Sequence, residues 1–255
     1  MPLVLHRRKD TRAGSAGFTL AELIVVVFMT GLLASLLLPA LSTAKEKSKR
    51  AVCQSNIRQL LMALHNYTDE NYQDLFPSSA DNMGYYHSIR LSDQTYSNLV
   101  EQLSGDTNVL YCPNIVFGDN SNSVARHDAY GYVIGYSYLV NTVTETSKGA
   151  DYYNSPISAH ASSTNELIAD ANYWTPAQTK PGGFAAMLKV APHTSMGAAM
   201  SKSSSFTVGL NGVNSASLGA AGGNIGYLDW SVRWRNITQM GTYTASSESD
   251  GYANW

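Results

Sequence analysis

The sequence lacks the residue patterns on which most enzymes depend. Its six histidines include no pair spaced four residues apart and no H-E-x-x-H motif for a catalytic metal. It has no phosphate-binding P-loop, and the serine in the string GYSYL lacks the second glycine of a nucleophile elbow. We therefore expect no catalytic residues and no enzyme activity. The missing P-loop also excludes an ATPase of the P-loop class.

Clustered basic residues are scarce in most of the chain. From residue 66 onward, 8 Lys and Arg stand against 16 Asp and Glu, whereas residues 1–17 hold four bases and one acid. Proteins that bind nucleic acid neutralise its phosphates with grouped Lys and Arg. The acidic balance after residue 66 therefore argues against a nucleic-acid partner.

What the sequence does contain is a run of 24 almost entirely apolar residues, from Phe18 to Leu41, whose single charge is Glu22. A helix of about 20 such residues crosses a bilayer core. The basic arm in residues 1–17 keeps the N-terminus in the cytoplasm and sends the rest of the chain outward. We therefore expect a single-pass membrane protein with an external head. An acid inside a spanning helix is costly, so Glu22 is expected to have a partner or a function.

The apolar run differs from an ordinary secretory signal peptide. It is longer than the usual hydrophobic region of about 7–15 residues, and no A-x-A-like cleavage site follows it. The string G-FTLAEL resembles the N-terminal signal of the type IV pilin and type II secretion pseudopilin superfamily. The resemblance implies that a prepilin peptidase cleaves after Gly17 and methylates the new terminal amine of Phe18. It also implies assembly roles for Glu22 and for Pro39, which stands where these pilins commonly have a helix-kinking proline.

Later blocks are similar to pilin-like proteins of planctomycetes and verrucomicrobia, many of which carry a C-terminal signature written H-X9-DG. The similar blocks are CQSNIRQLLMALHNYTDEN, LYCP, GYSYLVN, LIADA and GGNIGYLDWSVRWR. Asp229 matches the Asp of the signature, but Trp230 replaces its Gly and Gly219 stands where its His belongs. His193 could be the displaced His if residues 197–221 are an insertion.

The helical pattern continues beyond Pro39. Residues 42–68 contain no Gly or Pro, and Ile57, Leu60, Leu61, Leu64 and Tyr67 recur at helical spacing. The first half of the helix is apolar all round, whereas the second half has a single apolar stripe that requires a sheet to pack on. The predicted fold is α+β and pilin-like: one long N-terminal helix packed on an antiparallel β-sheet head with long loops.

The predicted segments follow from this division. We expect a cytoplasmic leader over residues 1–17, a transmembrane and filament-core helix over 18–41, an amphipathic stalk helix over 42–70 and an extracytoplasmic β-rich head over 71–255. Within the head, the pattern predicts a short helix at 97–103 and strands at 109–113, 129–141 and 166–170, with weaker strand signals at 184–190 and 205–210. Residues 222–237 are typical of a hairpin that turns at Asp229 and Trp230.

The two cysteines, Cys53 and Cys112, fall in the part expected outside the cytoplasm. They could be two buried thiols, but disulfides form in oxidising compartments, so a disulfide from the stalk helix to the head is the expectation. Closing a loop of about 60 residues would contribute about 4 kcal/mol on the chain-entropy model.

No cofactor and no metal is expected, and calcium is the one ligand kept open. Some major pseudopilins bind calcium through loop carboxylates and carbonyls, and Asp119, Asp128 and Asp151 lie in suitable loops, although no EF-hand spacing supports them.

The function that these features predict is that of a structural subunit in a type II secretion pseudopilus or a type IV pilus-like filament. The resemblance implies an inner-membrane protein that self-associates after processing by the prepilin peptidase and acts with an inner-membrane assembly platform. The filament would lie in the periplasm or on the cell surface. Glu22 of one subunit would meet the terminal amine of its neighbour, since opposite charges attract strongly in a low dielectric.

The alternative function is that of a monomeric, membrane-anchored surface protein whose head binds glycan or another surface. The aromatic residues that suggest this are Tyr85, Tyr86, Tyr152, Tyr153, Tyr173 and Trp174. Core and interface packing is the commoner use of such side chains.

Overall fold

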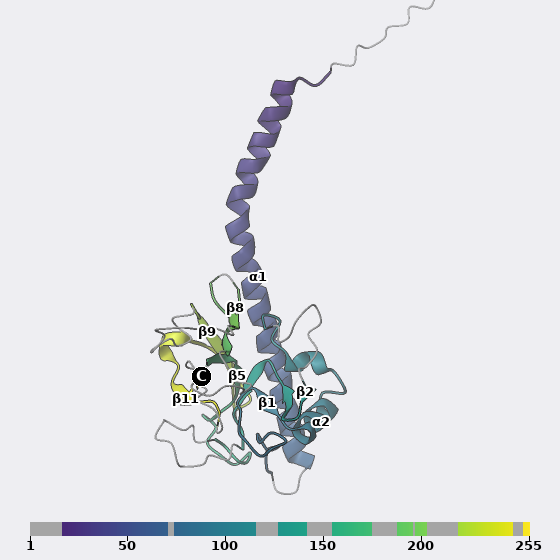
Figure 1. Ribbon diagram of the computed structural model, residues 1–255, viewed down its shortest axis with the longest axis vertical. Helices are drawn as coiled ribbons and strands as arrows, with labels where there is room; N and C mark the ends of the chain where they lie inside the picture. Colours follow the sequence, from purple (N-terminus) through teal and green to yellow (C-terminus); the bar gives the residue numbers. More distant parts are fainter. Residues whose placement is uncertain are drawn as a thin grey trace, which may run out of the picture. The chain divides into compact units, whose positions relative to one another are not determined.

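The computed structural model describes residues 17–70, 74–115, 127–141, 155–174, 188–195, 197–202, 219–246 and 252–255. The chain divides into two compact units, Met1–Leu41 and Ser42–Trp255. Helix α1 (Leu20–Glu70) is a single element of 51 residues that belongs to both (Figure 1). The sequence predicts a helix from residue 18 to residue 70, so α1 begins two residues later than predicted and ends at the predicted residue.

The second half of α1 buries one face, as its pattern predicts. Ile57, Leu60, Leu61 and Leu64 are 0–1% exposed, whereas Tyr67 is half-buried. Two polar residues of this face, Glu46 and Asn56, are also buried. The apolar stripe packs the helix on the head, and the polar residues place hydrogen-bonding groups in the same contact.

The sheet beneath α1 has the strand order β10-β9-β5-β4, with every pair antiparallel. Its strands are β4 (Tyr136–Tyr138), β5 (Glu166–Asp170), β9 (Gly222–Tyr227) and β10 (Val232–Asn236). A Cβ at Gly226 would lie 2.8 Å from Ile57 Cγ2 and 3.0 Å from Leu61 Cδ1. Glycine in β9 therefore lets the helix approach the sheet closely.

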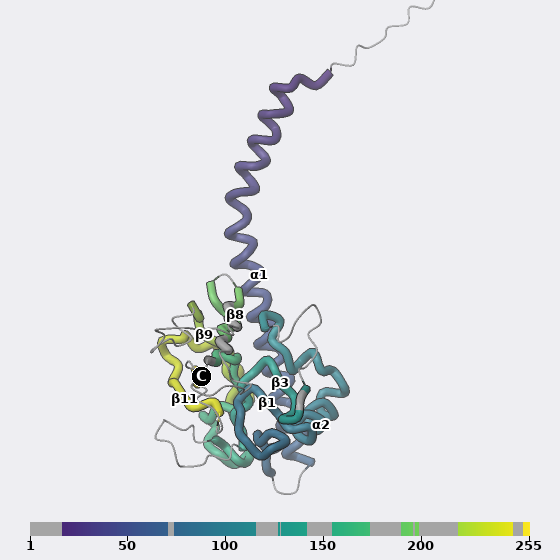
Figure 2. Tube along the Cα trace, viewed as in Figure 1, coloured from purple at the N-terminus to yellow at the C-terminus, as the bar shows by residue number. Residues whose placement is uncertain are grey.

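Two further sheets complete the described part of the head. One has the order β11-β12-β6-β7-β8 and consists of β6 (Asn172–Trp174), β7 (Leu188–Ala191), β8 (Ala199–Lys202), β11 (Thr242–Thr244) and β12 (Tyr252–Asn254). The other has the order β1-β3-β2 and consists of β1 (Arg90–Leu91), β2 (His127–Asp128) and β3 (Gly131–Val133). Helix α2 (Asp93–Gln102) lies beside β1 and β3 (Figure 2). A last 3-10 turn, η2 (Ile237–Gln239), follows β10.

Several predicted elements are confirmed. The strand at 166–170 has the predicted limits, the hairpin of β9 and β10 turns where expected, and β7 overlaps the weak signal at 184–190. Helix α2 begins four residues earlier than predicted because the Ser92 hydroxyl accepts a hydrogen bond from Thr95 N and caps it. The weak strand at 205–210 lies outside the described residues. The architecture as a whole is the predicted α+β, pilin-like one.

The strand predicted at 109–113 is wrong. Thr107–Leu110 form a 3-10 helix, η1, whose first turn is capped by the Asp106 carboxylate accepting from Asn108 N. The segment after this turn lies against Gly135, whose N–H donates a hydrogen bond to Leu110 O at 2.9 Å. That contact also interrupts the strand predicted at 129–141, which becomes β3 and β4 in two different sheets.

Candidate functional site

The first turn of α1 is closed by a reciprocal pair of hydrogen bonds. Thr19 N donates to Glu22 Oε2 at 2.9 Å, and Glu22 N donates to Thr19 Oγ1 at 3.2 Å. This arrangement is a capping box, which satisfies two of the free N–H groups at a helix start. Glu22 therefore has a role within its own chain that the pilin resemblance does not include. Its other oxygen, Oε1, receives no hydrogen bond from the residues that the structure describes.

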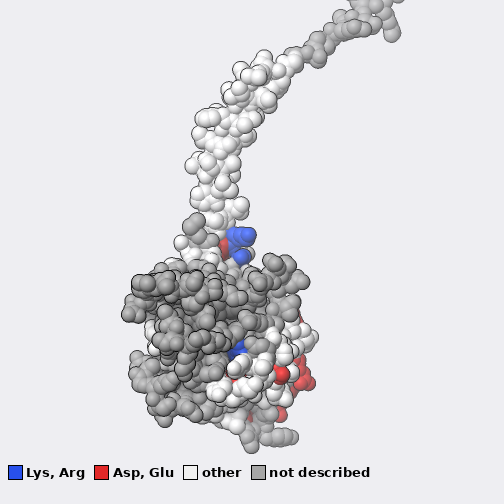
Figure 3. Space-filling model, viewed as in Figure 1, with Lys and Arg blue, Asp and Glu red and all other residues white. Residues whose placement is uncertain are grey.

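The surface of residues 18–41 is apolar and exposed. Its large hydrophobic side chains range from 50% exposed at Leu32 to 76% at Leu20. The face of this segment that Figure 3 draws shows no Lys, Arg, Asp or Glu, and its one charged residue is Glu22. The 24 residues would span about 36 Å as a helix, compared with about 30 Å for a bilayer core. Pro39 lies within α1, and the helix continues through it.

In the described part of the chain, α1 is the one helix that by length and composition could cross a membrane. The most apolar window of 18 residues has a mean hydropathy of 2.5 and is 0% buried. A core helix of a soluble protein would be mostly covered, so the exposed apolar surface fits single-pass membrane anchoring.

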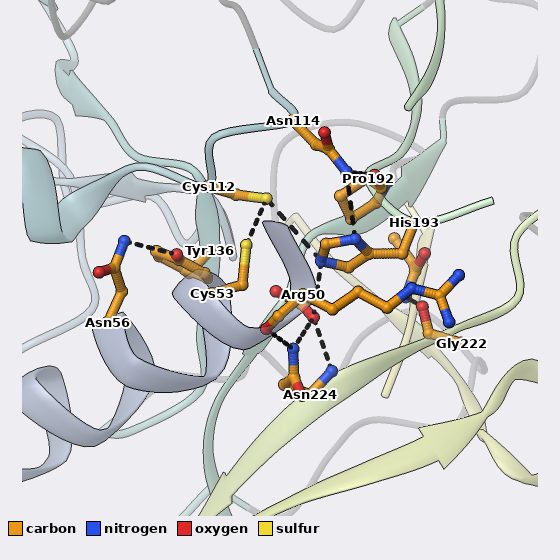
Figure 4. Close-up of polar contacts among 12 residues, drawn as sticks. Arg50, Cys53, Asn56, Cys112, Asn114, Tyr136, Pro192, His193, Gly222 and Asn224 are labelled. Carbon is orange, nitrogen blue, oxygen red and sulfur yellow. Dashed lines mark hydrogen bonds and ion pairs between the residues drawn. The ribbon is translucent and has the colours of Figure 1, made fainter. Parts of the chain in front are cut away.

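A second group of polar and ionisable residues lies in the head, where α1 meets four other segments. We call it the buried polar cluster; its members are Glu46, Cys53, Cys112, Asn114, Asp170, His193 and Asn224. All are between 0% and 5% exposed. Figure 4 shows the Cys112 sulfur between the Cys53 sulfur and the His193 ring, with Asn114 and Asn224 at the two ends of the group.

His193 connects the two carboxylates of the cluster. Its Nδ1–H donates to Glu46 Oε1 at 2.7 Å, and its Nε2 lies 3.3 Å from Asp170 Oδ2 and 3.9 Å from Cys112 Sγ. Burial disfavours the charged ring, but the hydrogen bonds and charges of Asp170 and Cys112 outweigh burial and raise the pKa of His193 to about 10.

Glu46 is held by three donors from separate parts of the chain. Arg50 Nε donates to Oε1 at 3.0 Å, Asn114 Nδ2 donates to Oε2 at 2.7 Å, and His193 contributes the third bond. The Arg50 guanidinium also lies 4.4 Å from the centre of the Trp234 ring. Burial would raise the pKa of Glu46, but these hydrogen bonds lower it below its usual value, so the carboxylate is charged.

Asp170, at the end of β5, accepts hydrogen bonds through Oδ2 from the backbone N and the side-chain Nδ2 of Asn224, at 2.6 and 3.0 Å. Its other oxygen, Oδ1, is buried and has no hydrogen-bond partner among the described residues. A buried carboxylate oxygen without a partner is uncommon, because its desolvation is uncompensated.

The two cysteines meet in this cluster. Their Sγ atoms lie 2.8 Å apart, and the structure holds both as free thiols. The contact with Cys112 and burial raise the pKa of Cys53. At Cys112 burial is outweighed by contacts with Cys53 and His193, which lower its pKa. The disulfide expected from the sequence is not formed here and stays a prediction, although the sulfurs are close enough to pair with a small movement.

The segment just before β9 lies beside His193. The His193 carbonyl oxygen accepts a hydrogen bond from Ala221 N at 2.8 Å, and Thr194 and Ala220 form an isolated bridge. The assignment of His193 as the displaced His of the C-terminal signature stays a prediction.

The turn of the β9–β10 hairpin contains the other two signature positions. The Asp229 carboxylate accepts from Ser231 N at 3.0 Å and from Arg233 NH2 at 2.6 Å. Trp230 has a φ of +60°, a backbone region that glycine adopts without strain, and its ring centre lies 4.6 Å from that of His65. The tryptophan thus adopts a left-handed backbone conformation, and its ring packs on His65 of α1.

The calcium candidates are not brought together by any described contact. Asp119 and Asp151 lie outside the described residues, and Asp128 lies in β2 with its side chain outside them. Two of the six aromatic residues suggested for a glycan- or surface-binding face are buried: Tyr86 and Tyr173 are 7% and 3% exposed. Tyr85 is 41% exposed, while Tyr152, Tyr153 and the side chain of Trp174 are outside the described part.

In comparison with known proteins, the chain is similar to type II secretion system core protein G of Pseudomonas aeruginosa, with 34% identity over 68 residues. These residues are 27% of this chain and 46% of that protein, so the chain spans less than half of the relative that it matches. No family model and no solved structure matches the chain. The partial similarity and the long apolar helix fit the pilin-like superfamily that the N-terminal sequence resembles.

Proposed function

We propose that this protein is a structural subunit of a filament of the type II pseudopilus or type IV pilus-like kind. The observation that carries the proposal is the exposed apolar surface of residues 18–41 on a helix that continues into the head. Such a surface requires either lipid or copies of itself, because leaving it in water is unfavourable. The similarity to a type II secretion core protein supports a pseudopilus-like role.

Maturation begins at Gly17. In the proposed sequence of events a prepilin peptidase cleaves after Gly17, methylates the amine of Phe18 and removes the basic arm. The subunit then remains in the inner membrane through residues 18–41, with its head outside the cytoplasm. The assembly platform moves it from the bilayer into a bundle with other copies.

Glu22 contributes the specific contact in this bundle. Its Oε2 is occupied by Thr19, while Oε1 is open among the described residues and can accept the Phe18 amine of a neighbouring subunit. Two opposite charges that leave water together favour contact over isolation. The capping box and the pairing therefore use different oxygens of the same carboxylate.

The experiment compares two substitutions of Glu22. Gln can still accept and donate in a capping box, because Glu and Gln serve equally at this position, but it carries no charge. Ala removes both functions. We expect Glu22→Gln and Glu22→Ala to be exported and cleaved, and neither to appear in sheared surface material or in pelleted filaments. Glu22→Asp retains the charge and is expected to retain part of the assembly.

Mass spectrometry of the mature N-terminus tests the processing step separately. The mature chain is expected to begin at methylated Phe18, and Gly17→Val is expected to leave the precursor in the membrane. Gly31→Val is the matched control, because a Cβ at Gly31 meets nothing within 4 Å, and it is expected to be cleaved normally. An intact Met1 in assembled filaments would refute the processing step, and normal assembly of Glu22→Gln would refute the charge pairing.

A further inference from the structure

Four side chains of the buried polar cluster have the chemistry of metal ligands and meet at one point. Cys53 comes from α1, Cys112 from the segment after η1, Asp170 from the end of β5 and His193 from the segment after β7. One ligand atom of each lies within 4.8 Å of the other three, and all four residues are buried. Two thiolates, an imidazole nitrogen and a carboxylate oxygen are a donor set that tetrahedral zinc accepts.

The His193 ring is oriented as it is in metal sites. Nδ1–H donates to Glu46 Oε1, which leaves Nε2 directed at Asp170 and Cys112. A histidine that binds a metal through one nitrogen almost always donates the other N–H to a carboxylate or carbonyl. Glu46 is in turn held by Arg50 and Asn114, so the orientation of the ring is determined by a second layer of hydrogen bonds.

Two of three spacings between the ligand atoms are within about 0.1 Å of those expected around a tetrahedral ion. Bonds of about 2.0–2.3 Å at tetrahedral angles place ligand atoms about 3.3–3.8 Å apart. The distance from Nε2 to Asp170 Oδ2 is 3.3 Å and that from Nε2 to Cys112 Sγ is 3.9 Å. The 2.8 Å between the two sulfurs is shorter than this range, so binding requires the Cys53 side chain to move away from Cys112 by about 1 Å.

A disulfide would account for the sulfurs alone. It would not explain why an imidazole and a carboxylate, those of His193 and Asp170, are buried against two thiols. A cation at this point gives the buried carboxylate a partner as well. A surface depression of about 360 Å³, lined by Val52, Asn56 and Cys112 among others, adjoins the cluster at Cys112.

We propose that Cys53, Cys112, Asp170 and His193 form a structural site for one divalent transition-metal ion, with zinc as the expected metal. The ion takes the place of protons: both thiols lose theirs to become thiolates, and His193 binds through a deprotonated Nε2. The site joins α1 to three segments of the head. It does not depend on the proposed filament role, and it is an alternative to the disulfide expected from the sequence.

The first test uses the full chain purified in detergent without reductant. We expect one zinc per chain by elemental analysis and two titratable thiols after denaturation with a chelator. Chains isolated without metal are expected to bind added Zn²⁺ at one equivalent. A mass 2 Da below that of the dithiol, with no thiols and no metal, would overturn the proposal in favour of the disulfide. Two free thiols that bind no added Zn²⁺ would overturn it as well.

The second test replaces zinc with Co²⁺ in the wild-type chain, so that it does not depend on any variant folding. Thiolate ligands are expected to give charge-transfer absorption in the near ultraviolet, together with the visible bands of tetrahedral Co²⁺. Asp170→Asn is expected to shift the visible bands and keep the thiolate absorption. His160→Gln, which alters an exposed histidine, is the control and is expected to leave the spectrum unchanged. Octahedral Co²⁺ without thiolate absorption would refute the site.

Glu46→Gln tests the second layer of hydrogen bonds. Loss of an outer partner of this kind lowers metal affinity about 10–100-fold. We expect that decrease in a competition titration with a zinc chelator, with one equivalent still bound. An unchanged affinity would show that Glu46 does not position His193 for a metal.

Discussion

Replacement of Glu46 by alanine is predicted to destabilise the fold strongly. The carboxylate is 3% exposed and accepts hydrogen bonds from Arg50, Asn114 and His193. Alanine removes the acceptor from all three donors at once. Arg50 keeps its hydrogen bond to Thr194 O and Asn114 keeps that to Pro192 O, but both lose the carboxylate. The buried His193 N–H loses its acceptor, and the positive charges near this point lose the negative charge of Glu46.

The magnitude follows from the groups left behind. Breaking a buried ion pair by removing one partner costs about 3–5 kcal/mol. A domain is stable by about 5–15 kcal/mol, so the loss is a large fraction of the total. For a protein of this size each kcal/mol shifts the melting temperature by roughly 2–4 °C, which gives a decrease of about 6–20 °C.

Thermal unfolding of the full chain in detergent, followed by near-ultraviolet circular dichroism, measures this shift. Lys47→Ala is the matched control, because Lys47 is the next residue of α1 and is exposed; its effect is expected to stay within about 0.5 kcal/mol. Glu46→Gln retains a hydrogen-bonding side chain and is expected to fall between the two. If Glu46→Ala has the same melting temperature as Lys47→Ala, the Glu46 carboxylate does not stabilise the packing of α1 on the head.

Three further predictions concern the head, and denaturant unfolding measures each of them. A Cβ at Gly135 would lie 2.5 Å from Cys112 N, so Gly135→Ala is expected to cost about 1–3 kcal/mol by displacing backbone, and an unchanged midpoint would contradict the close approach. Trp230 has a left-handed backbone conformation, which strains any residue except glycine. Both Trp230→Gly and Trp230→Ala lose the ring that packs on His65, but only glycine removes the strain, so the Gly variant is expected to be about 1 kcal/mol more stable than the Ala variant. The reverse order of stability would contradict this account. Hydrogen bonds from Ser231 and the charge of Arg233 hold the pKa of Asp229 below its usual value. The contribution of Asp229 to folding stability is therefore fully present above about pH 4 and is lost as the pH falls through the folded-state pKa. The stability difference between wild type and Asp229→Asn should therefore narrow in acid, and a difference that is constant with pH would refute the assignment.

The sequence pattern predicts correctly those elements whose structure depends on residues close together in the chain. The apolar spacing from Ile57 to Leu64 predicts the buried face of α1, and alternating residues around a polar turn predict the β9–β10 hairpin. The segment at 109–113 was mispredicted because its strand-forming residues are overridden by the Asp106 cap and by the contact with Gly135. Tertiary contacts of this kind are not visible in a short window of sequence.

The buried polar cluster could not be assembled from the sequence, because its members lie far apart along the chain: Glu46 and His193, which share a hydrogen bond, are 147 residues apart. Glu46 was hidden among four bases in a stretch that looks like a solvated helix face. One signal was present: Glu46, Arg50, Cys53 and Ile57 follow one another at helical spacing, which places the acid on the same face as the buried stripe.

The continuity of α1 has a mechanical consequence. The same helix that carries the exposed apolar residues also carries Ile57, Leu61 and Leu64, which are buried in the head. Within the unit that begins at Ser42, a force applied along the axis of this half of α1 would load the row of side chains in shear. Contacts loaded in parallel must slide together, whereas contacts peeled from one end fail one at a time. This half of α1 is therefore expected to resist a pull along its axis far better than a pull directed away from the sheet.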